Sequence, residues 1–374
     1  MSNNQEIIGR DEINDLEAIL SVTNTDVDAL DHSVVATFDS VFTWDYERSR
    51  EPLVKLYEKA KTSQWNVTTD LDWTIDVDQE KLALEDMNRE DVQFFSDAVD
   101  LSGTTFENWT EKEWVDLSIQ SQNWTLSQFM HGEQGALLCT ARIVETVPWI
   151  DAKYYAATQV MDEARHVEAF ATYLDQKLSG HYPINAHLGL LIDDILRDSR
   201  WDMTYLGMQI MVEGLALAAF GFMHQMTTEP LLKQMLRYIM SDEARHVAFG
   251  VLSLQEYYKE LSDAEMKDRQ EFAFEAAVRM RDRFLQQEVW DRLGVDVKDA
   301  IRLTMADEGR QMFQSILFSK IVPNCKKLGL LERNDAWLRK RFTELGVIQF
   351  EDWVDTGEEY SMLDEVAKDR AASA

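Results

Sequence analysis

Apolar residues recur at helical spacing along most of the chain, and this pattern predicts a mostly helical protein. Positions three and four apart build one apolar face of a helix, whereas the two-residue alternation of a strand is scarce. With 5 prolines and 15 glycines in 374 residues, few positions interrupt helices. The predicted helices span residues 27–43, 51–63, 79–99, 111–146, 149–178, 188–227, 230–260, 265–293 and 297–322.

Short breaks at Pro148, Gly180 to Pro183, Pro230 and Gly294 separate the central helices, as antiparallel neighbours in a bundle require. No linker is long enough to split the chain. We therefore predict N-terminal helices and an acidic loop over 1–110, a bundle core over 111–262, and C-terminal helices over 263–374 that complete the same domain.

Two stretches outside the bundle core carry no visible chemistry in the sequence. The region from Trp65 to Asp78 is rich in Asp and Thr and is expected to be a connecting loop. The last dozen residues are expected to form a frayed tail.

The most apolar run, Leu206 to Met223, is about long enough to suggest a membrane span. It contains Gln209 and Glu213, however, and charged stretches flank it. A buried helix with a functional carboxylate explains this run better than a membrane span.

Charge and cysteine content narrow the classes of partner. The 68 acidic and 37 basic residues give a formal net charge of −31, which repels nucleic acids and anionic membranes. Two cysteines are too few for a disulfide framework, a four-thiolate iron site or a typical structural zinc site. The polar, acidic N-terminus shows no secretory signal, so we expect a cytoplasmic protein.

A duplication carries the candidate chemistry. The hexapeptide Asp-Glu-Ala-Arg-His-Val occurs at 162–167 and again at 242–247. In each copy the Glu and His are three residues apart, so both side chains leave one face of a helix and can bind one metal ion. The ligand pairs are Glu163 with His166 and Glu243 with His246.

The duplication extends upstream to Glu133 and Glu213, each of which lies 30 residues before the Glu of its partner motif. Pro148 divides the first interval evenly, so two antiparallel helices meeting there place Glu133 and Glu163 at one level, about 22 Å from the turn. Pro230 divides the second interval almost as evenly. Four facing helices thus supply four Glu and two His to one layer of a bundle.

This ligand set is the one described for di-iron and di-manganese carboxylate bundles. Carboxylates with two imidazoles suit iron or manganese, and iron is the expected metal. Buried carboxylates also need cations to compensate them. The alternative is a set of surface Glu/His pairs, but Glu213 inside a nearly continuous apolar run does not fit that interpretation.

Residues 124–260 resemble the ferritin-like di-iron carboxylate superfamily, and within it the bacterial multicomponent monooxygenase hydroxylases and the ribonucleotide reductase small subunit. The resemblance implies an all-α fold, a ferritin-like four-helix bundle with additional flanking helices. It also implies that Asp162 bonds His246 and Asp242 bonds His166, with Arg165 and Arg245 supporting the two aspartates.

The chain departs from these families at two positions. Phe170 stands where the reductase relatives have a radical-forming Tyr, and Leu217 stands where the hydroxylases have a Thr. Storage of a tyrosyl radical in that form is therefore not expected, nor is a close copy of the hydroxylase oxygen-activation step.

We expect an oxygen-dependent di-iron oxidoreductase, specifically a monooxygenase, with Phe170, Leu217 and Phe220 lining the pocket of a small organic substrate. A dinucleotide fingerprint and a cysteine cluster are both absent from the sequence, which implies an external electron donor such as a ferredoxin or reductase. The alternatives are a ferroxidase, an Mn/Fe radical-type protein and a desaturase-like protein. Family resemblance also suggests a homodimer.

Overall fold

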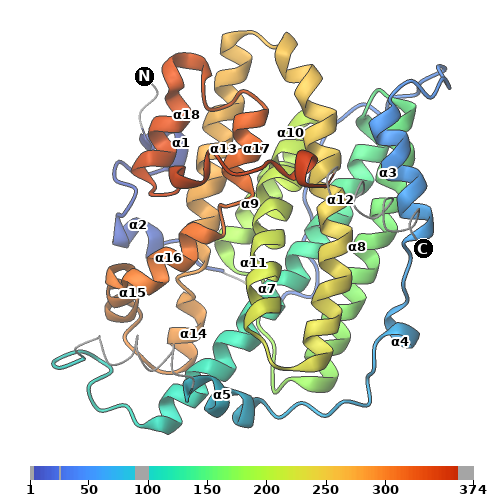
Figure 1. Ribbon diagram of the computed structural model, residues 1–374. Helices are drawn as coiled ribbons and strands as arrows, with labels where there is room; N and C mark the ends of the chain where they lie inside the picture. The colour runs from blue at the N-terminus through green and yellow to red at the C-terminus, as the bar shows by residue number, and fades with distance from the viewer. Residues whose placement is uncertain (1–3, 25–26, 89–100, 361–374) are drawn as a thin grey trace.

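The computed structural model describes residues 4–24, 27–88 and 101–360, and this part of the chain contains helices and no strands. Its centre consists of four long helical segments (Figure 1). They are α7 (Glu111–Thr146), α8 (Ile150–Lys177), the continuous segment formed by η1 (Leu206–Val212) and α11 (Glu213–Met226), and α12 (Pro230–Glu260). The fold is all-α, with the ferritin-like four-helix bundle that the sequence predicted.

Local signals set the ends of these helices. The backbone N–H of Thr110 donates to Glu113 at 2.9 Å, which closes a capping box at the start of α7. The carboxylate of Glu229 accepts from the backbone N–H groups of Leu231 and Leu232 at 2.7 and 2.6 Å, and Pro230 occupies the first turn of α12. The two helix pairs therefore turn at Pro148 and Pro230.

The third segment begins with α10 (Trp201–Tyr205) and runs through η1, a π-helical stretch, into α11. Trp201–Met226 is long and apolar enough to cross a membrane, with a mean hydropathy of 1.6 over its most apolar window. Of that window, 78% is buried inside the protein. The helix occupies the bundle core, as the polar residues Gln209 and Glu213 suggested.

The remaining helices cover the bundle. α3 (Glu51–Thr62) packs on α8 and α12, while α13 (Asp263–Arg283) packs on η1, α9 (Ala186–Arg197) and α18 (Arg333–Glu344) (Figure 1). The shorter elements are α1 (Asn4–Ile8), α2 (Leu16–Leu20), α4 (Val67–Asp70), α5 (Gln79–Met87), α14 (Gln287–Arg292), α15 (Val297–Ala306), α16 (Glu308–Ile316), α17 (Ile321–Lys327) and η2 (Ile348–Phe350).

The prediction of a helix at 27–43 is wrong. Residues 31–50 are non-helical and lie along the surface, where the Val41 N–H donates to the Glu145 carbonyl at 2.8 Å. Val35 and Phe42 are 87% and 80% exposed. A helical apolar pattern stabilises a short helix only when its apolar face is buried, and this segment buries no such face.

Three other helix predictions need correction at their boundaries. The predicted helix 188–227 breaks at 198–200, and the predicted helix 265–293 breaks at 284–286, where Gln286 is left-handed with φ of 56°. The predicted helix 297–322 is divided into α15, α16 and α17. The sequence reading missed α18, because Leu338 and Phe342 are its only buried residues. The end of the predicted helix 79–99 and the predicted tail lie outside the described residues.

Candidate metal centre

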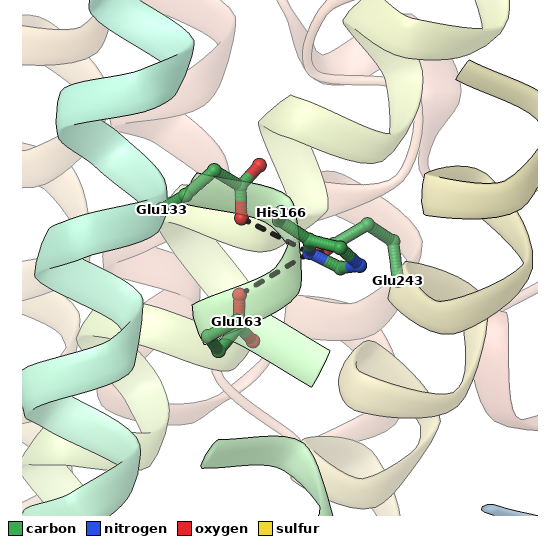
Figure 2. Close-up of side chains that lie close together, drawn as sticks. All are labelled: Glu133, Glu163, His166 and Glu243. Carbon is green, nitrogen blue, oxygen red and sulfur yellow. Dashed lines mark hydrogen bonds and ion pairs between the residues drawn. The ribbon is translucent and has the colours of Figure 1, made fainter. Parts of the chain in front are cut away.

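Six predicted ligands meet in one buried layer of the bundle. Glu133 comes from α7, Glu163 and His166 from α8, Glu213 from the start of α11, and Glu243 and His246 from α12. None is more than 5% exposed. Figure 2 shows Glu133, Glu163, His166 and Glu243 converging from three helices on one point. The equal 30-residue spacing thus places the side chains at one level, as the sequence predicted.

The cluster resolves into two groups, each compact enough to hold one ion. One consists of Glu133, Glu163, His166 and Glu243, and the other of Glu163, Glu213 and His246, with ligand atoms within 4.8 Å of one another in each group. Because Glu163 belongs to both groups, the two positions are adjacent. The cluster fits a di-metal site.

Glu163 and Glu243 lie between the two imidazoles. The carboxylate of Glu163 is 3.0 Å from His246 Nδ1 and 3.5 Å from His166 Nδ1. The carboxylate of Glu243 is 3.1 Å from His166 Nδ1 and 3.4 Å from His246 Nδ1. Both imidazoles turn Nδ1 toward the carboxylates, so Nδ1 is the nitrogen available for a metal ion.

Although these charged groups lie close together, several inward atoms of the cluster make no hydrogen bond to the described residues. They are Glu163 Oε2, Glu213 Oε2, both carboxylate oxygens of Glu243, and His246 Nδ1. Buried polar atoms without partners are costly, so their concentration in one place calls for a missing partner. Two divalent cations would supply that partner and balance the four carboxylate charges. The residues therefore fit a pair of metal ions.

The shifted pKa values of the metal-free cluster also indicate a site for cations. Burial, followed by the charge of Glu243, raises the pKa of Glu133 well above its usual range, and burial and the charge of Glu163 do the same to Glu213. Burial also acts against the ionised form of Glu163, but the neighbouring imidazoles outweigh it and lower its pKa. The carboxylates likewise overcome the burial of His166 and His246 and raise the pKa of both. In the metal-free protein, bound protons therefore offset part of the negative charge that metal ions would neutralise.

The hydrogen bonds expected around the ligands are present. His246 Nε2 lies 3.3 Å from Asp162 Oδ2, and His166 Nε2 lies 3.2 Å from Asp242 Oδ2. Each imidazole thus donates outward to a carboxylate on another helix, which fixes its tautomer and leaves Nδ1 as the inward nitrogen. Arg165 and Arg245 each contact both aspartates.

The loop that contains Trp65 contacts the surroundings of the cluster, which its sequence did not indicate. The indole Nε1–H of Trp65 donates to Asp242 Oδ2 at 2.8 Å, and the ring stacks on Tyr238 at 5.2 Å between centroids. Trp65, Asp242 and His166 thus form a continuous chain of hydrogen bonds from the loop after α3 to the cluster. No sequence spacing indicates this contact, because Trp65 and Asp242 are 177 residues apart.

Two glutamines were also missed. Gln159 lies one turn before Glu163 on α8, and its Nε2 donates to Glu163 at 3.0 Å and to Glu213 at 2.9 Å. Its position four residues before a ligand could have indicated it. Gln64, next to Trp65, accepts a hydrogen bond of 2.7 Å from Arg165.

A narrow cavity of about 20 Å³, which is room for about one water molecule, borders three of the ligands. It is lined by Gln128, Phe129, Gly132, Glu133, Ala136, Val212, Glu213, Ala216, Glu243 and Arg283. Phe170 and Phe220 pack against Phe129, with ring centroids 6.0 and 4.7 Å from its ring, and Leu217 on α11 is also buried. A substrate pocket lined by those three residues stays a prediction.

No family model and no curated protein matches the chain. Solved structures of R2-like ligand-binding oxidases are similar to it in fold. One, with an aerobically reconstituted metal cofactor after photoconversion, has a TM-score of 0.48 and 18% identity, covering 76% of this chain and 95% of that chain. Another, with an aerobically reconstituted Mn/Fe cofactor, has a TM-score of 0.43 and 17% identity, covering 83% and 94%. The chemistry of the site follows from the chain's own residues.

Proposed function

We propose that this protein is an oxygen-dependent di-metal oxidoreductase, and specifically a monooxygenase that acts on a small organic substrate. One observation carries the proposal: two adjacent groups of buried ligands share Glu163, and several of their inward atoms have no hydrogen-bond partner among the described residues. A structural site would need one ion only, whereas paired ions suit two-electron chemistry with dioxygen.

Iron at both positions is the favoured occupancy, with a mixed manganese and iron centre as the alternative, because the donor set suits either metal. The six ligands would be Glu133, Glu163, His166, Glu213, Glu243 and His246. When bound, the metal pair supplies the electrons and coordination positions that dioxygen needs. In the proposed stoichiometry, one oxygen atom enters the substrate and the other leaves as water, with two electrons and two protons taken up.

The chain's own residues hold, balance and shield this centre. The four carboxylates match the charge of two divalent ions, and Asp162 and Asp242 hold the imidazoles in one orientation. Gln159 fixes Glu163 and Glu213 relative to each other. Burial of all six ligands excludes bulk water, which protects a reactive oxidant from side reactions.

The electrons are proposed to come from a separate ferredoxin or reductase. The Trp65–Asp242–His166 chain gives a direct contact between the outer loop and the cluster, along which an electron could enter. A cytoplasmic location, a homodimer and the absence of nucleic-acid or membrane partners remain part of the proposal and rest on the sequence.

The first test is metal analysis of the purified protein, followed by anaerobic loading with Fe(II) and an optical spectrum after exposure to dioxygen. We expect close to two metal ions per chain and an absorption band that develops with oxygen. Glu213→Ala and His246→Ala should each lose at least one ion per chain. Glu168→Ala, at an exposed position on α8, is the matched control and should keep both. Full metal content in both ligand variants would refute the site.

A ferroxidase is the second candidate, because the narrow cavity admits Fe(II) and dioxygen more readily than a large molecule. A ferroxidase would consume oxygen with Fe(II) as its only reductant and give no organic product. Oxygen uptake that depends on an electron donor and an added organic substrate would favour the monooxygenase.

A further inference from the structure

Gln209 carries a buried amide that makes no hydrogen bond. The residue is fully buried, and neither Oε1 nor Nε2 has a hydrogen-bond partner among the described residues. Burying an unpaired amide costs free energy, whereas leucine or methionine would fill a similar volume without that cost. The run from Leu206 to Met223 is otherwise apolar, apart from the metal ligand Glu213. An amide at this place therefore needs an explanation other than packing.

The side chain of Gln209 starts close to metal ligands on two helices. Gln209 lies in η1, four residues before Glu213, which begins α11. A Cβ at Gly250 would lie 2.7 Å from Cβ and 3.6 Å from Cγ of Gln209, so this side chain packs directly on the α12 backbone. Gly250 follows the ligand His246 by four residues on α12. The side chain therefore starts about one helical turn from a ligand on each of the two helices.

The two groups of ligands differ in number. One metal position has four ligands, and the other has three, which are Glu163, Glu213 and His246. We call the second the three-ligand position. Manganese favours octahedral coordination, and non-haem iron centres that use dioxygen keep coordination positions open beside their protein ligands. The three-ligand position therefore leaves more room in its coordination sphere for solvent than the position with four ligands.

The sequence duplication is broken around this three-ligand position. Residues 80 apart correspond in the duplication, so Gln209 corresponds to Phe129, and Gln159 corresponds to Ile239. All four lie four residues before a ligand glutamate. Only the three-ligand position thus has an amide one turn before each of its glutamates. Because Gln159 already donates to both of those glutamates, Gln209 is the amide that remains free for another partner.

We propose that Gln209 is a positioning residue of the metal centre, and that its amide holds a solvent molecule bound at the three-ligand position by a hydrogen bond. A glutamine amide suits this role because it can both donate to water and accept from it. The inference rests on the two-metal centre of the proposed function and assigns different roles to the two positions. The position with four ligands holds its ion more tightly, and the three-ligand position carries the exchangeable solvent.

The first test is titration of the metal-free chain with Mn(II), in which EPR measures the free ion and gives the two affinities. The variant is Gln209→Leu, because leucine keeps the Cβ and Cγ that pack on Gly250 and removes the amide. It should weaken binding of the second ion at least about tenfold and leave the first within about twofold. Met208→Leu, at the adjacent buried position, is the matched control and should change neither affinity.

Stability of the metal-free protein distinguishes this role from a structural one. The unpaired amide destabilises the metal-free fold, so Gln209→Leu should unfold at the same or a higher denaturant concentration than the unaltered protein. The expected variant is therefore no less stable and yet binds one ion more weakly. Unfolding at a lower denaturant concentration would show that the amide stabilises the fold, and would overturn the inference. Unchanged affinities for both ions, or an equal loss for both, would overturn it as well.

Pulsed EPR of the Mn(II)-loaded chain in water enriched in oxygen-17 tests the solvent directly. The coupling between Mn(II) and the oxygen-17 of bound water should be present in the unaltered protein and weaker in Gln209→Leu. Weaker metal binding with an unchanged coupling would mean that the amide contacts the ion itself, and would overturn the solvent-holding role. Two bound ions without any reaction of the Fe(II)-loaded protein with dioxygen would refute the proposed function alone. Failure of the unaltered protein to bind Mn(II) would refute both.

Discussion

At the scale of single residues, Asp162 and Asp242 join the two halves of the metal centre. Each accepts a hydrogen bond from the imidazole of the opposite repeat and contacts both arginines, so neither Glu-x-x-His motif is complete by itself. The duplication seen in the sequence therefore has a physical reason. Each copy supplies two ligands to the cluster and one orienting carboxylate to the other copy.

Trp65→Phe tests whether the hydrogen bond from Trp65 to Asp242 increases the metal affinity of the cluster. The phenyl ring keeps the stacking on Tyr238 but removes the indole N–H, so Asp242 and His166 are held less firmly. We expect metal affinity to fall about tenfold, measured by competition with a chelator. Trp73→Phe removes an indole that donates to the Val67 carbonyl and should leave the affinity unchanged. Equal affinities in the two variants would contradict the role assigned to Trp65.

The raised pKa values predict that metal binding releases protons. Burial and the neighbouring charges raise the folded-state pKa values of Glu133, Glu213, His166 and His246 above their ordinary ones, so the metal-free cluster binds protons more tightly than free side chains do. Metal ions bind the deprotonated forms. Metal affinity should therefore rise with pH and fall as the pH drops below neutral. A pH indicator in weakly buffered solution should report at least about two protons released per chain. No release on loading two ions would contradict this assignment.

At the scale of elements, close packing of η1 against α12 sets the position of Glu213. A Cβ at Gly250 would lie 2.7 Å from Cβ of Gln209 and 3.1 Å from Cδ1 of Ile210, so only glycine permits this approach. η1 is π-helical and ends at Val212, directly before Glu213. The irregular turn and the missing side chain at Gly250 together bring this helix to α12.

Gly250→Ala should therefore destabilise the protein by about 1–3 kcal/mol, because the added methyl group must displace η1. Chemical denaturation of the metal-free protein measures this change without a contribution from metal binding. Gly221→Ala is the matched control on α11, where the nearest atom is Met240 Cε at 3.7 Å. That substitution should stabilise the protein by about 0.5–1 kcal/mol, because alanine favours a helix interior. An unchanged free energy of unfolding for Gly250→Ala would show that η1 can shift to make room for the methyl group at little cost.

At the scale of the whole molecule, the ligands tie α7, α8, α11 and α12 together at their centre. In the described part of the chain, the metal-free bundle carries buried polar atoms without hydrogen-bond partners there, and metal binding would remove that penalty. The centre is then a structural element of the fold as well as its chemical site.

Metal loading should therefore stabilise the entire domain. With free metal at one hundred times the dissociation constant, one site contributes about 2.7 kcal/mol. We expect a higher melting temperature for the loaded protein in calorimetry, with a smaller increase for Glu213→Ala. An unchanged melting temperature with two ions bound would show that the unfolded chain binds the metal equally well.

The sequence by itself determined the helical class, the central helices and the six residues that meet in the buried cluster. Helix rise is constant, so equal spacing of Glu133 from Glu163 and of Glu213 from Glu243 places all four at one level, and the period of apolar residues shows which face is buried. These features depend on neighbours within one helix or across one turn, and a sequence records them directly.

Only the tertiary structure placed Trp65 on Asp242 and Arg283 in the cavity beside the ligands. It also showed that residues 31–50 form no helix, despite their apolar pattern. Such features depend on which distant surfaces pack together, and packing is decided by the total free energy of the fold. No local spacing encodes it, because a charge or an indole acquires its role from partners contributed by other elements.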